Sequence, residues 1–175
     1  NEKSQMIMRY PNDSFYFIDP DGEYQPLCDK FMGQTVRLAN GSSDHINPLD
    51  LELNSGDSIE EALALKIDFL QALCEIMVGA EMTAEATGII DRCGRAIYKP
   101  YIEHIKTLAP KGVTIDYQAM PTLKTFYEEI MEQGDELATR FALAIEPYCV
   151  GTKDVFAYPT NVNIKSRVVV FNILG

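Results

Sequence analysis

The chain has 175 residues, of which 46% are hydrophobic and 23% are charged. This composition is typical of a globular domain and excludes a disordered chain, and no apolar run approaches the roughly 18–20 residues that a membrane helix requires. The formal net charge of −11 argues against a chain that grips nucleic-acid phosphates by itself, because such binding needs clustered Lys and Arg.

The first part of the chain predicts one helix and two strands. Residues 3–9 are compatible with a helix that stops before Pro11, because a proline disfavours the helical region for the residue ahead of it. Residues 14–18 are rich in aromatic side chains and predict a short buried strand. Residues 34–38 alternate in polarity and predict a second strand, which a polar loop follows.

A long helix is predicted after this loop. Ser58 suits its N-cap, apolar residues then repeat at helical spacing, and Gly79 suits its end. A second set of apolar residues widens the stripe, so we expect this helix to be covered on more than one side. That second set is Leu65, Phe69, Leu73 and Ile76.

Three further helices are predicted. One begins at Thr83, and Pro100 is expected to kink or restart it. Residues 109–117 read as a loop or a short extended segment. Another helix begins at Pro121, and Asp135 caps the last one.

The end of the chain returns to extended structure, at residues 155–158 and in the apolar run 168–173. The order of strand, strand, four helices and strand predicts the α/β class, with a helical insertion between two strands of one sheet. We expect residues 1–57 and 150–175 to form the sheet region, and residues 58–149 to form the insertion.

Several common functional motifs are absent from the sequence. There is no GxxxxGK[ST] phosphate loop and no GxGxxG, and the two histidines, His45 and His104, form no metal-binding pair. The cysteines form no CxxC motif, and a disulfide framework is not expected at this size, which favours a reducing, cytoplasmic setting. The cysteines are Cys28, Cys74, Cys93 and Cys149.

Three segments nevertheless carry a resemblance. The first is an apolar strand that ends in DPxGEY, formed by Asp19, Pro20, Asp21, Gly22, Glu23 and Tyr24. The second is residues 33–38 followed by Asn47 and Pro48 within the run 46–51. The third is Thr160 and Asn161, which lead through Arg167 into the final strand.

In this order the three segments resemble the ATPase domain of VirB-type conjugation ATPases of type IV secretion systems, which belong to the FtsK/HerA group of P-loop motors. The branch carried by conjugative transposons of Gram-positive bacteria is the most similar. The resemblance runs from about Glu2 to Leu174, and it implies part of a P-loop NTPase sheet with a helical insertion.

The resemblance also implies where the ATP-binding and magnesium-binding motifs of the family lie relative to this chain. In that family the phosphate loop immediately precedes a helix that corresponds to residues 2–9, and the carboxylates that hold magnesium lie on a strand beyond residue 175. We therefore expect this chain to be an internal fragment of a longer protein, truncated at both ends and lacking both motifs. No catalytic residue carries over, and we do not expect this chain alone to hydrolyse ATP.

Two carboxylates are candidates for a position near the nucleotide. Asp19 ends a strand beside the expected phosphate loop, where it could face magnesium or a water, and Glu23 follows four residues later. The alternative is structural: Asp19 caps the turn with Pro20, and Glu23 is solvated or pairs with a base elsewhere.

The other motif residues are expected to be structural. Asn47 should hold a loop through an Asx-type bond while Pro48 fixes the backbone, and Asn161 should shape the turn before the last strand. Pro20, Tyr24, Thr160 and Arg167 belong with them. Three arginines on predicted helix surfaces could reach a neighbouring subunit or DNA, although exposed ion pairs worth about 0–1 kcal/mol are commoner. They are Arg92, Arg95 and Arg140.

The resulting expectation is an internal segment of an ATPase motor that energises conjugative DNA transfer or type IV secretion. This chain itself holds no cofactor, and ATP and magnesium are implied for the parent. The implied partners are other subunits of the same ATPase, as a hexamer, and conjugation-channel proteins. DNA is reached only through the parent, which lies at the cytoplasmic face of the membrane without inserting into it. The alternative is a stand-alone acidic helical module that docks a basic protein without nucleotide chemistry.

Overall fold

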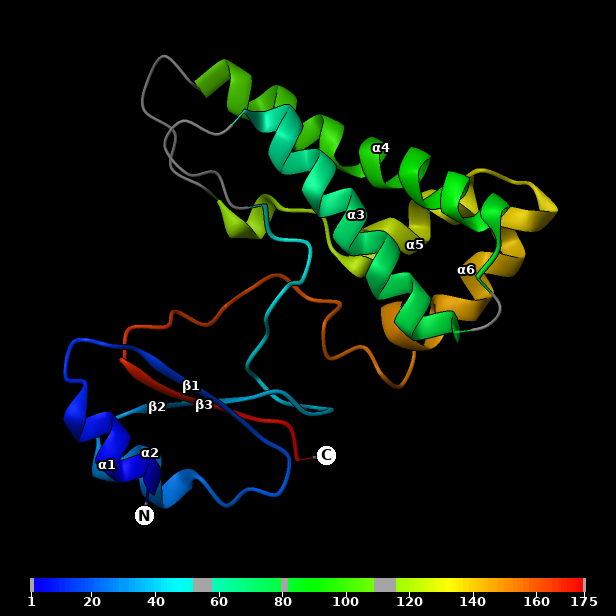
Figure 1. The fold of residues 1–175 in the computed structure, drawn as a ribbon. Helices are drawn as coiled ribbons and strands as arrows, with labels where there is room; N and C mark the ends of the chain where they lie inside the picture. Colours follow the sequence, from blue (N-terminus) through cyan, green and yellow to red (C-terminus); the bar gives the residue numbers. More distant parts are fainter. Residues whose placement is uncertain (1, 52–57, 80–81, 109–115, 175) are drawn as a thin grey trace. The chain divides into compact units, whose positions relative to one another are not determined.

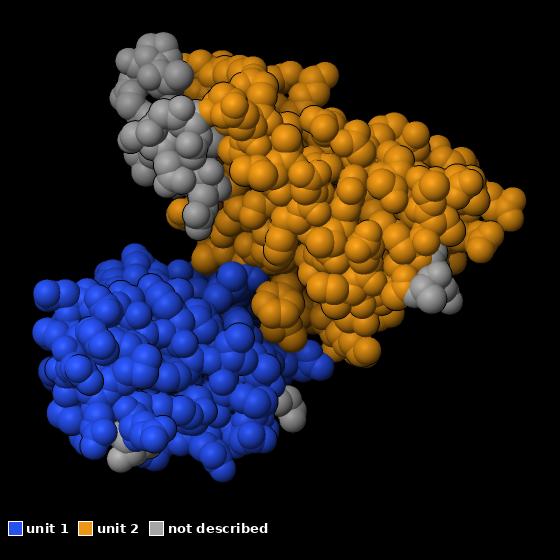
Figure 2. Space-filling model, in the orientation of Figure 1, with its two compact units in different colours: residues 1–46, 161–175 blue, residues 47–160 orange. Residues whose placement is uncertain are grey.

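The computed structural model describes residues 2–51, 58–79, 82–108 and 116–174 (Figure 1). The chain divides into two compact units (Figure 2). Unit 1 comprises residues 1–46 and 161–175, and unit 2 comprises residues 47–160. The boundaries thus fall at 46/47 and 160/161, whereas the sequence analysis places them at 57/58 and 149/150.

Unit 1 is built on a parallel sheet with the strand order β1-β3-β2 in the described residues. The strands are β1 (Phe15–Asp19), β2 (Gln34–Arg37) and β3 (Val168–Asn172), and all three predicted strands are confirmed. The strand from the far end of the chain occupies the centre, and its first three residues are buried valines. Such an apolar run is typical of a parallel strand that is covered on both faces.

Two helices pack against this sheet, namely α1 (Glu2–Arg9) and α2 (Gln25–Lys30). Ile7 of α1 and Leu27 of α2 are buried with Val168, and three aromatic side chains pack around them: Phe15, Phe17 and Phe31. α2 was not predicted from the sequence, because six residues are too few to display a helical repeat.

Gly33 connects α2 to β2 at a point of close backbone approach. Its N–H donates to the Cys28 carbonyl at 2.8 Å. A Cβ at this position would lie 2.7 Å from the Val168 carbonyl oxygen and 2.8 Å from the Cys28 Sγ. Glycine is therefore required here for lack of space.

Unit 2 contains the helical insertion between β2 and β3. Its helices are α3 (Ile59–Val78), α4 (Ala84–Leu108), the short 3₁₀ helix η3 (Tyr117–Ala119), α5 (Leu123–Glu132) and α6 (Glu136–Cys149). The four predicted α-helices are confirmed. Ser58 caps α3 by accepting the Glu61 N–H, and Asp135 caps α6 by accepting the Ala138 N–H.

Some details of the helical prediction are wrong. α4 continues through Pro100, so of the two predicted outcomes, a kink or a restart, the restart does not occur. α5 is capped by Thr122 and begins at Leu123, not at Pro121. Residues 155–158 form a turn, in which the Ala157 N–H donates to the Asp154 carbonyl. Of the predicted connection 109–117, residues 109–115 lie outside the described residues.

The core of unit 2 is formed by all four α-helices. Its fully buried members include Phe126 and Tyr98, and the Tyr98 hydroxyl donates to the Leu49 carbonyl. The second apolar stripe of α3 is covered only in part by the described residues: Leu73 packs against the core, whereas Leu65 and Ile76 are 71% and 81% exposed.

Two thiols in this core predict how stability changes with pH. Burial raises the pKa of Cys74 and of Cys149 from the ordinary 9.0 to about 12. Above pH 9 the unfolded chain therefore releases these protons while the folded chain retains them, so the unfolded state binds fewer protons and stability falls as pH rises from 9 to about 12. Urea unfolding at several pH values measures this slope. A Cys74→Ala, Cys149→Ala double variant should show a shallower slope, and an unchanged slope would contradict the assignment.

Candidate functional site at the carboxyl edge of the sheet

The three parallel strands end together at one edge of the sheet. Asp19 at the end of β1 is in register with Asn172 of β3, which is in register with Arg37 of β2. In open α/β sheets, ligands bind outside the carboxyl ends of the strands. This edge is therefore where unit 1 would bind a ligand, and the DPxGEY motif lies directly on it.

Asp19 holds the turn that follows β1. Its side chain is buried, with 2% exposure. One carboxylate oxygen accepts the Glu23 N–H at 3.0 Å, and the other accepts the Tyr24 N–H at 3.0 Å. Gly22, with φ +72°, lets the chain reverse within this turn. Both Asp19 oxygens are thus engaged by the backbone of its own motif.

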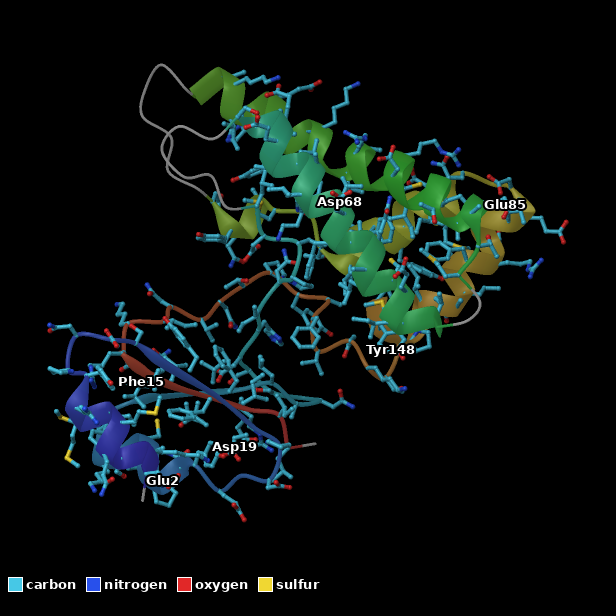
Figure 3. All side chains as sticks on the ribbon, in the orientation of Figure 1. Glu2, Phe15, Asp19, Asp68, Glu85 and Tyr148 are labelled. Atoms are coloured by element: carbon cyan, nitrogen blue, oxygen red, sulfur yellow. The ribbon has the colours of Figure 1, made fainter. Side chains whose placement is uncertain are left out.

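Tyr24 joins this turn to the start of α1. Figure 3 labels Asp19, which precedes the turn, and Glu2, the first residue of α1. The Lys3 ammonium donates to the Tyr24 hydroxyl and lies 3.8 Å from the centre of the ring. The same ring packs edge-on against Phe17, with 5.6 Å between the ring centres. Sequence reasoning missed Lys3, for which the only available signal is its place in the helix that would follow a phosphate loop.

A polar pocket of about 390 Å³ lies beside this contact. It is lined by Lys3, Ser4, Glu23, Tyr24, Pro26, Leu27 and Lys30. Glu23 is exposed, and it is the one carboxylate in the lining, beside two ammonium groups. The lining can therefore attract an anionic group, and its charge at neutral pH is opposite in sign to that of the whole chain.

The geometry of Asp19 yields a prediction about stability. Asp19→Ala should lower the free energy of unfolding by about 1–3 kcal/mol, because two backbone N–H groups in a buried turn lose their acceptor. Asp19→Asn retains one acceptor oxygen and should show a smaller loss. Urea unfolding measures both, and Asp21→Ala, an exposed carboxylate in the same turn, is the matched control. Equal losses for Asp19→Ala and Asp21→Ala would show that the two bonds do not hold the turn.

Asn47 lies at the start of unit 2 and is 2% exposed. Its carboxamide oxygen accepts the Leu49 N–H at 3.0 Å, an Asx turn across Pro48. Its carboxamide nitrogen donates to the Asp50 carboxylate at 3.0 Å and to the Pro121 carbonyl at 2.9 Å. Both polar atoms of this side chain thus form hydrogen bonds within unit 2.

Thr160, the last residue of unit 2, is tied to the first. The Asn47 N–H donates to the Thr160 hydroxyl oxygen at 2.8 Å, and that hydroxyl donates to the Asp50 carboxylate. The segments by which the chain enters and leaves unit 2 are therefore fastened to each other.

Asn161 makes the equivalent connection within unit 1. Its carboxamide oxygen accepts the His45 N–H at 2.8 Å, and its carboxamide nitrogen donates to the Ser43 carbonyl at 2.7 Å. These bonds reach a segment more than a hundred residues earlier in the chain. Asn161 was expected to shape a local turn. Its side chain instead links the segment by which the chain leaves unit 1, at Ser43 and His45, to the segment by which it returns.

Arg167 fastens the end of α1 to the start of β3. Its guanidinium donates to the Ile7 carbonyl at 2.9 Å and to the Tyr10 carbonyl at 2.8 Å, and it lies over the Phe15 ring. A cation that binds the last carbonyls of a helix also interacts favourably with the helix dipole.

The three helix-surface arginines lie in unit 2. Arg92 is 4.0 Å from the Asp135 carboxylate, and Arg95 is 3.0 Å from the Asp91 carboxylate; both pairs are exposed. Arg140 lines a separate pocket of about 540 Å³ that includes residues of α3, α4 and α6. Exposed pairs of this kind contribute about 0–1 kcal/mol each.

Within residues 2–51, 58–79, 82–108 and 116–174, no group of three or more His, Cys, Asp or Glu side chains is placed to hold a metal ion. Both carboxylate oxygens of Asp19 accept hydrogen bonds from the backbone of the turn that follows it. In the same ranges, no helix is both long enough and apolar enough to cross a membrane.

No protein-family model matches the chain, and no curated protein matches it. Its fold is similar to that of VirB4 of Thermoanaerobacter pseudethanolicus, with a TM-score of 0.76 and 23% sequence identity. The match covers 98% of this chain and 64% of that VirB4 chain, so this chain spans less than two thirds of its length. At this identity the likeness establishes the fold. The predicted α/β class, a parallel sheet with helices inserted between two of its strands, is confirmed, and it is an arrangement shared with this VirB4.

Proposed function

We propose that the chain is an internal segment of an ATPase motor that energises conjugative DNA transfer or type IV secretion. The observation that carries the proposal is the likeness to VirB4 over 98% of the chain at a TM-score of 0.76. The order of the DPxGEY, Asn-Pro and Thr-Asn motifs supports it independently of the fold.

In this proposal unit 1 is part of the nucleotide-binding sheet, and unit 2 is the helical insertion. Asp19 and Glu23 lie near the nucleotide, Asp19 by setting the turn after β1 and Glu23 by facing the pocket that contains Lys3. The phosphate-binding loop and the magnesium-binding carboxylates belong to other parts of the parent protein, which are needed for hydrolysis.

The parent would act with other subunits of the same ATPase, as a hexamer, and with conjugation-channel proteins. It would work in the cytoplasm at the inner face of the membrane. DNA would be contacted only in the context of the parent, since this chain carries a net charge of −11.

Calorimetry tests whether this chain binds nucleotide without the phosphate loop of the parent protein. The 175-residue chain should bind ATP–magnesium no more tightly than about 1 mM, because it lacks the backbone amides and the lysine of a phosphate loop. The longer natural protein that contains it should hydrolyse ATP. Micromolar binding by this chain alone, or a longer protein with no ATPase activity, would contradict the proposal.

A second candidate function is a stand-alone acidic helical module that docks a basic protein. The observation that favours it is the exposed apolar and acidic face of α3. The mass of the native polypeptide distinguishes the two, because a mature product of 19.6 kDa leaves no room for the rest of a motor.

A further inference from the structure

The outward face of α3 carries apolar residues at coiled-coil spacing. Steps of three and four residues alternate along this face, as in the a and d positions of a heptad repeat. We call this set the α3 seam, and it consists of Ala62, Leu65, Phe69, Ala72 and Ile76. Leu65, Phe69 and Ile76 are 71%, 45% and 81% exposed.

Most of the seam lies outside the core of unit 2, and among the described residues of the seam Ala62 is the one that packs against that core. The opposite side of α3 presents Ile67, Leu70 and Cys74, which are buried in the core. α3 is also capped at both ends, by Ser58 and by Gly79 with φ 60°. The seam extends from Ala62 to Ile76 within this helix, a length of about 21 Å at 1.5 Å per residue. Contiguous exposed apolar strips of this kind mark interaction surfaces.

An acidic column runs along one flank of the seam. Glu61, Asp68 and Glu75 recur every seventh residue, at the g positions of the same heptad, and all three are exposed. Asp68 is labelled on α3 in Figure 3. Within the described residues, none of the three carboxylates has a Lys, Arg or His within salt-bridge distance. On the other flank, Lys66 donates to the Pro48 carbonyl and lies 5.1 Å from the Phe69 ring.

We propose that the α3 seam is a docking surface for a basic amphipathic helix of a partner protein. The apolar side of that helix would cover the seam, and its Lys or Arg residues would lie opposite the acidic column, as e and g charges do in coiled coils. This inference does not depend on the motor assignment.

The charges argue against two other occupants. A second copy packed antiparallel would place one acidic column against the other, and a parallel copy would set Glu61 opposite Lys66 but Asp68 opposite Leu73. An anionic membrane surface would be repelled by the column and by the net charge of −11. A basic helix satisfies both the apolar and the acidic features.

Two synthetic helical peptides serve as probes. Both carry leucine at the a and d positions, and the flanking e and g positions are all Lys in one peptide and all Glu in the other. Fluorescence anisotropy with the complete 175-residue chain should show saturable micromolar binding of the Lys peptide, and binding of the Glu peptide weaker by about tenfold or more.

Variants of the chain establish where the peptide binds. Leu65→Glu with Ile76→Glu should abolish binding of the Lys peptide and leave the far-ultraviolet circular dichroism unchanged, because both side chains are exposed. Met32→Glu, at an 89% exposed apolar residue of unit 1, is the matched control and should bind normally. The triple variant Glu61→Lys, Asp68→Lys, Glu75→Lys reverses the charge of the acidic column. It should therefore bind the Glu peptide more tightly than the Lys peptide.

Three results would overturn the proposal. The first is no binding of the Lys peptide at about 100 µM. The second is binding that the seam or column variants do not alter. The third is light scattering that shows a dimer of the chain which Leu65→Glu with Ile76→Glu dissociates, since that would assign the seam to a second copy.

Discussion

Replacing Asn47 with alanine should destabilise unit 2 by about 3 kcal/mol, because removing one partner of a buried hydrogen bond costs about 1–3 kcal/mol and three such bonds are lost. The Leu49 N–H, the Asp50 carboxylate and the Pro121 carbonyl would each lose the Asn47 carboxamide. Because Asn47 is only 2% exposed, water reaches these groups poorly in the variant. Urea unfolding followed by circular dichroism at 222 nm, which reports mainly the helices of unit 2, measures the loss.

Asn161→Ala is the matched control. Asn161 makes a similar number of side-chain bonds, to His45 and Ser43, but it is exposed. Water can replace those bonds, so the loss should be below about 1 kcal/mol. If both alanine variants lost the same free energy, the contribution of Asn47 would not come from buried hydrogen bonds.

Phe126→Ala should be the most destabilising single change in the helical unit. Phe126 of α5 is 0% exposed and belongs to the core formed by α3, α4, α5 and α6. Removing a buried phenyl ring leaves a cavity and costs about 3–5 kcal/mol. The expected result in urea is a marked fall in the unfolding midpoint with little change in the slope of the transition.

Phe69→Ala provides the comparison for this change. Phe69 lies on the α3 seam with 45% exposure, so its truncation should cost below about 1 kcal/mol. A loss at Phe69 as large as that at Phe126 would mean that the seam is covered within this chain. That result would also remove the basis for docking a partner there.

Local sequence signals predicted the long elements well. α3 and α6 have side-chain caps at Ser58 and Asp135 together with an apolar repeat over several turns, so two independent signals agree. The strands β1, β2 and β3 are short but stand out by aromatic content, alternation and an apolar run.

Errors occurred where local preference and tertiary contacts disagree. Residues 155–158 have strand-forming side chains, yet Asp154 organises them into a turn through its carbonyl and through its carboxylate, which accepts the Tyr158 hydroxyl. The helix also does not restart at Pro100, which lies within α4. Neither outcome is visible from a window of a few residues.

The unit boundaries were set by contacts that a sequence window cannot show. Asn47 binds Thr160, and Asn161 binds His45, across more than a hundred residues in each case. The Asx turn at Asn47 follows from the Asn-Pro pair, but the partners Thr160 and Pro121 do not. These long-range bonds place residues 47–51 and 150–160 within the helical unit.

The position of the DPxGEY motif at the end of a strand was predictable from the sequence, whereas its contacts were not. The end of a strand followed by DPxGEY pointed to Asp19 and Glu23. The two backbone donors that bind Asp19, and the approach of Lys3 to Tyr24, depend on how α1 packs beside the turn. Packing of that kind is a tertiary property, and the short α2 that completes the pocket had no sequence signal of its own.

The coding sequence on both sides of these residues tests the central claim most directly. If the chain is an internal segment of a P-loop motor, a GxxxxGK[ST] motif should lie within about twenty residues before Asn1, and an apolar strand that ends in Asp-Glu should follow Gly175. A gene that encodes neither motif, with a native product of 19.6 kDa, would contradict the claim.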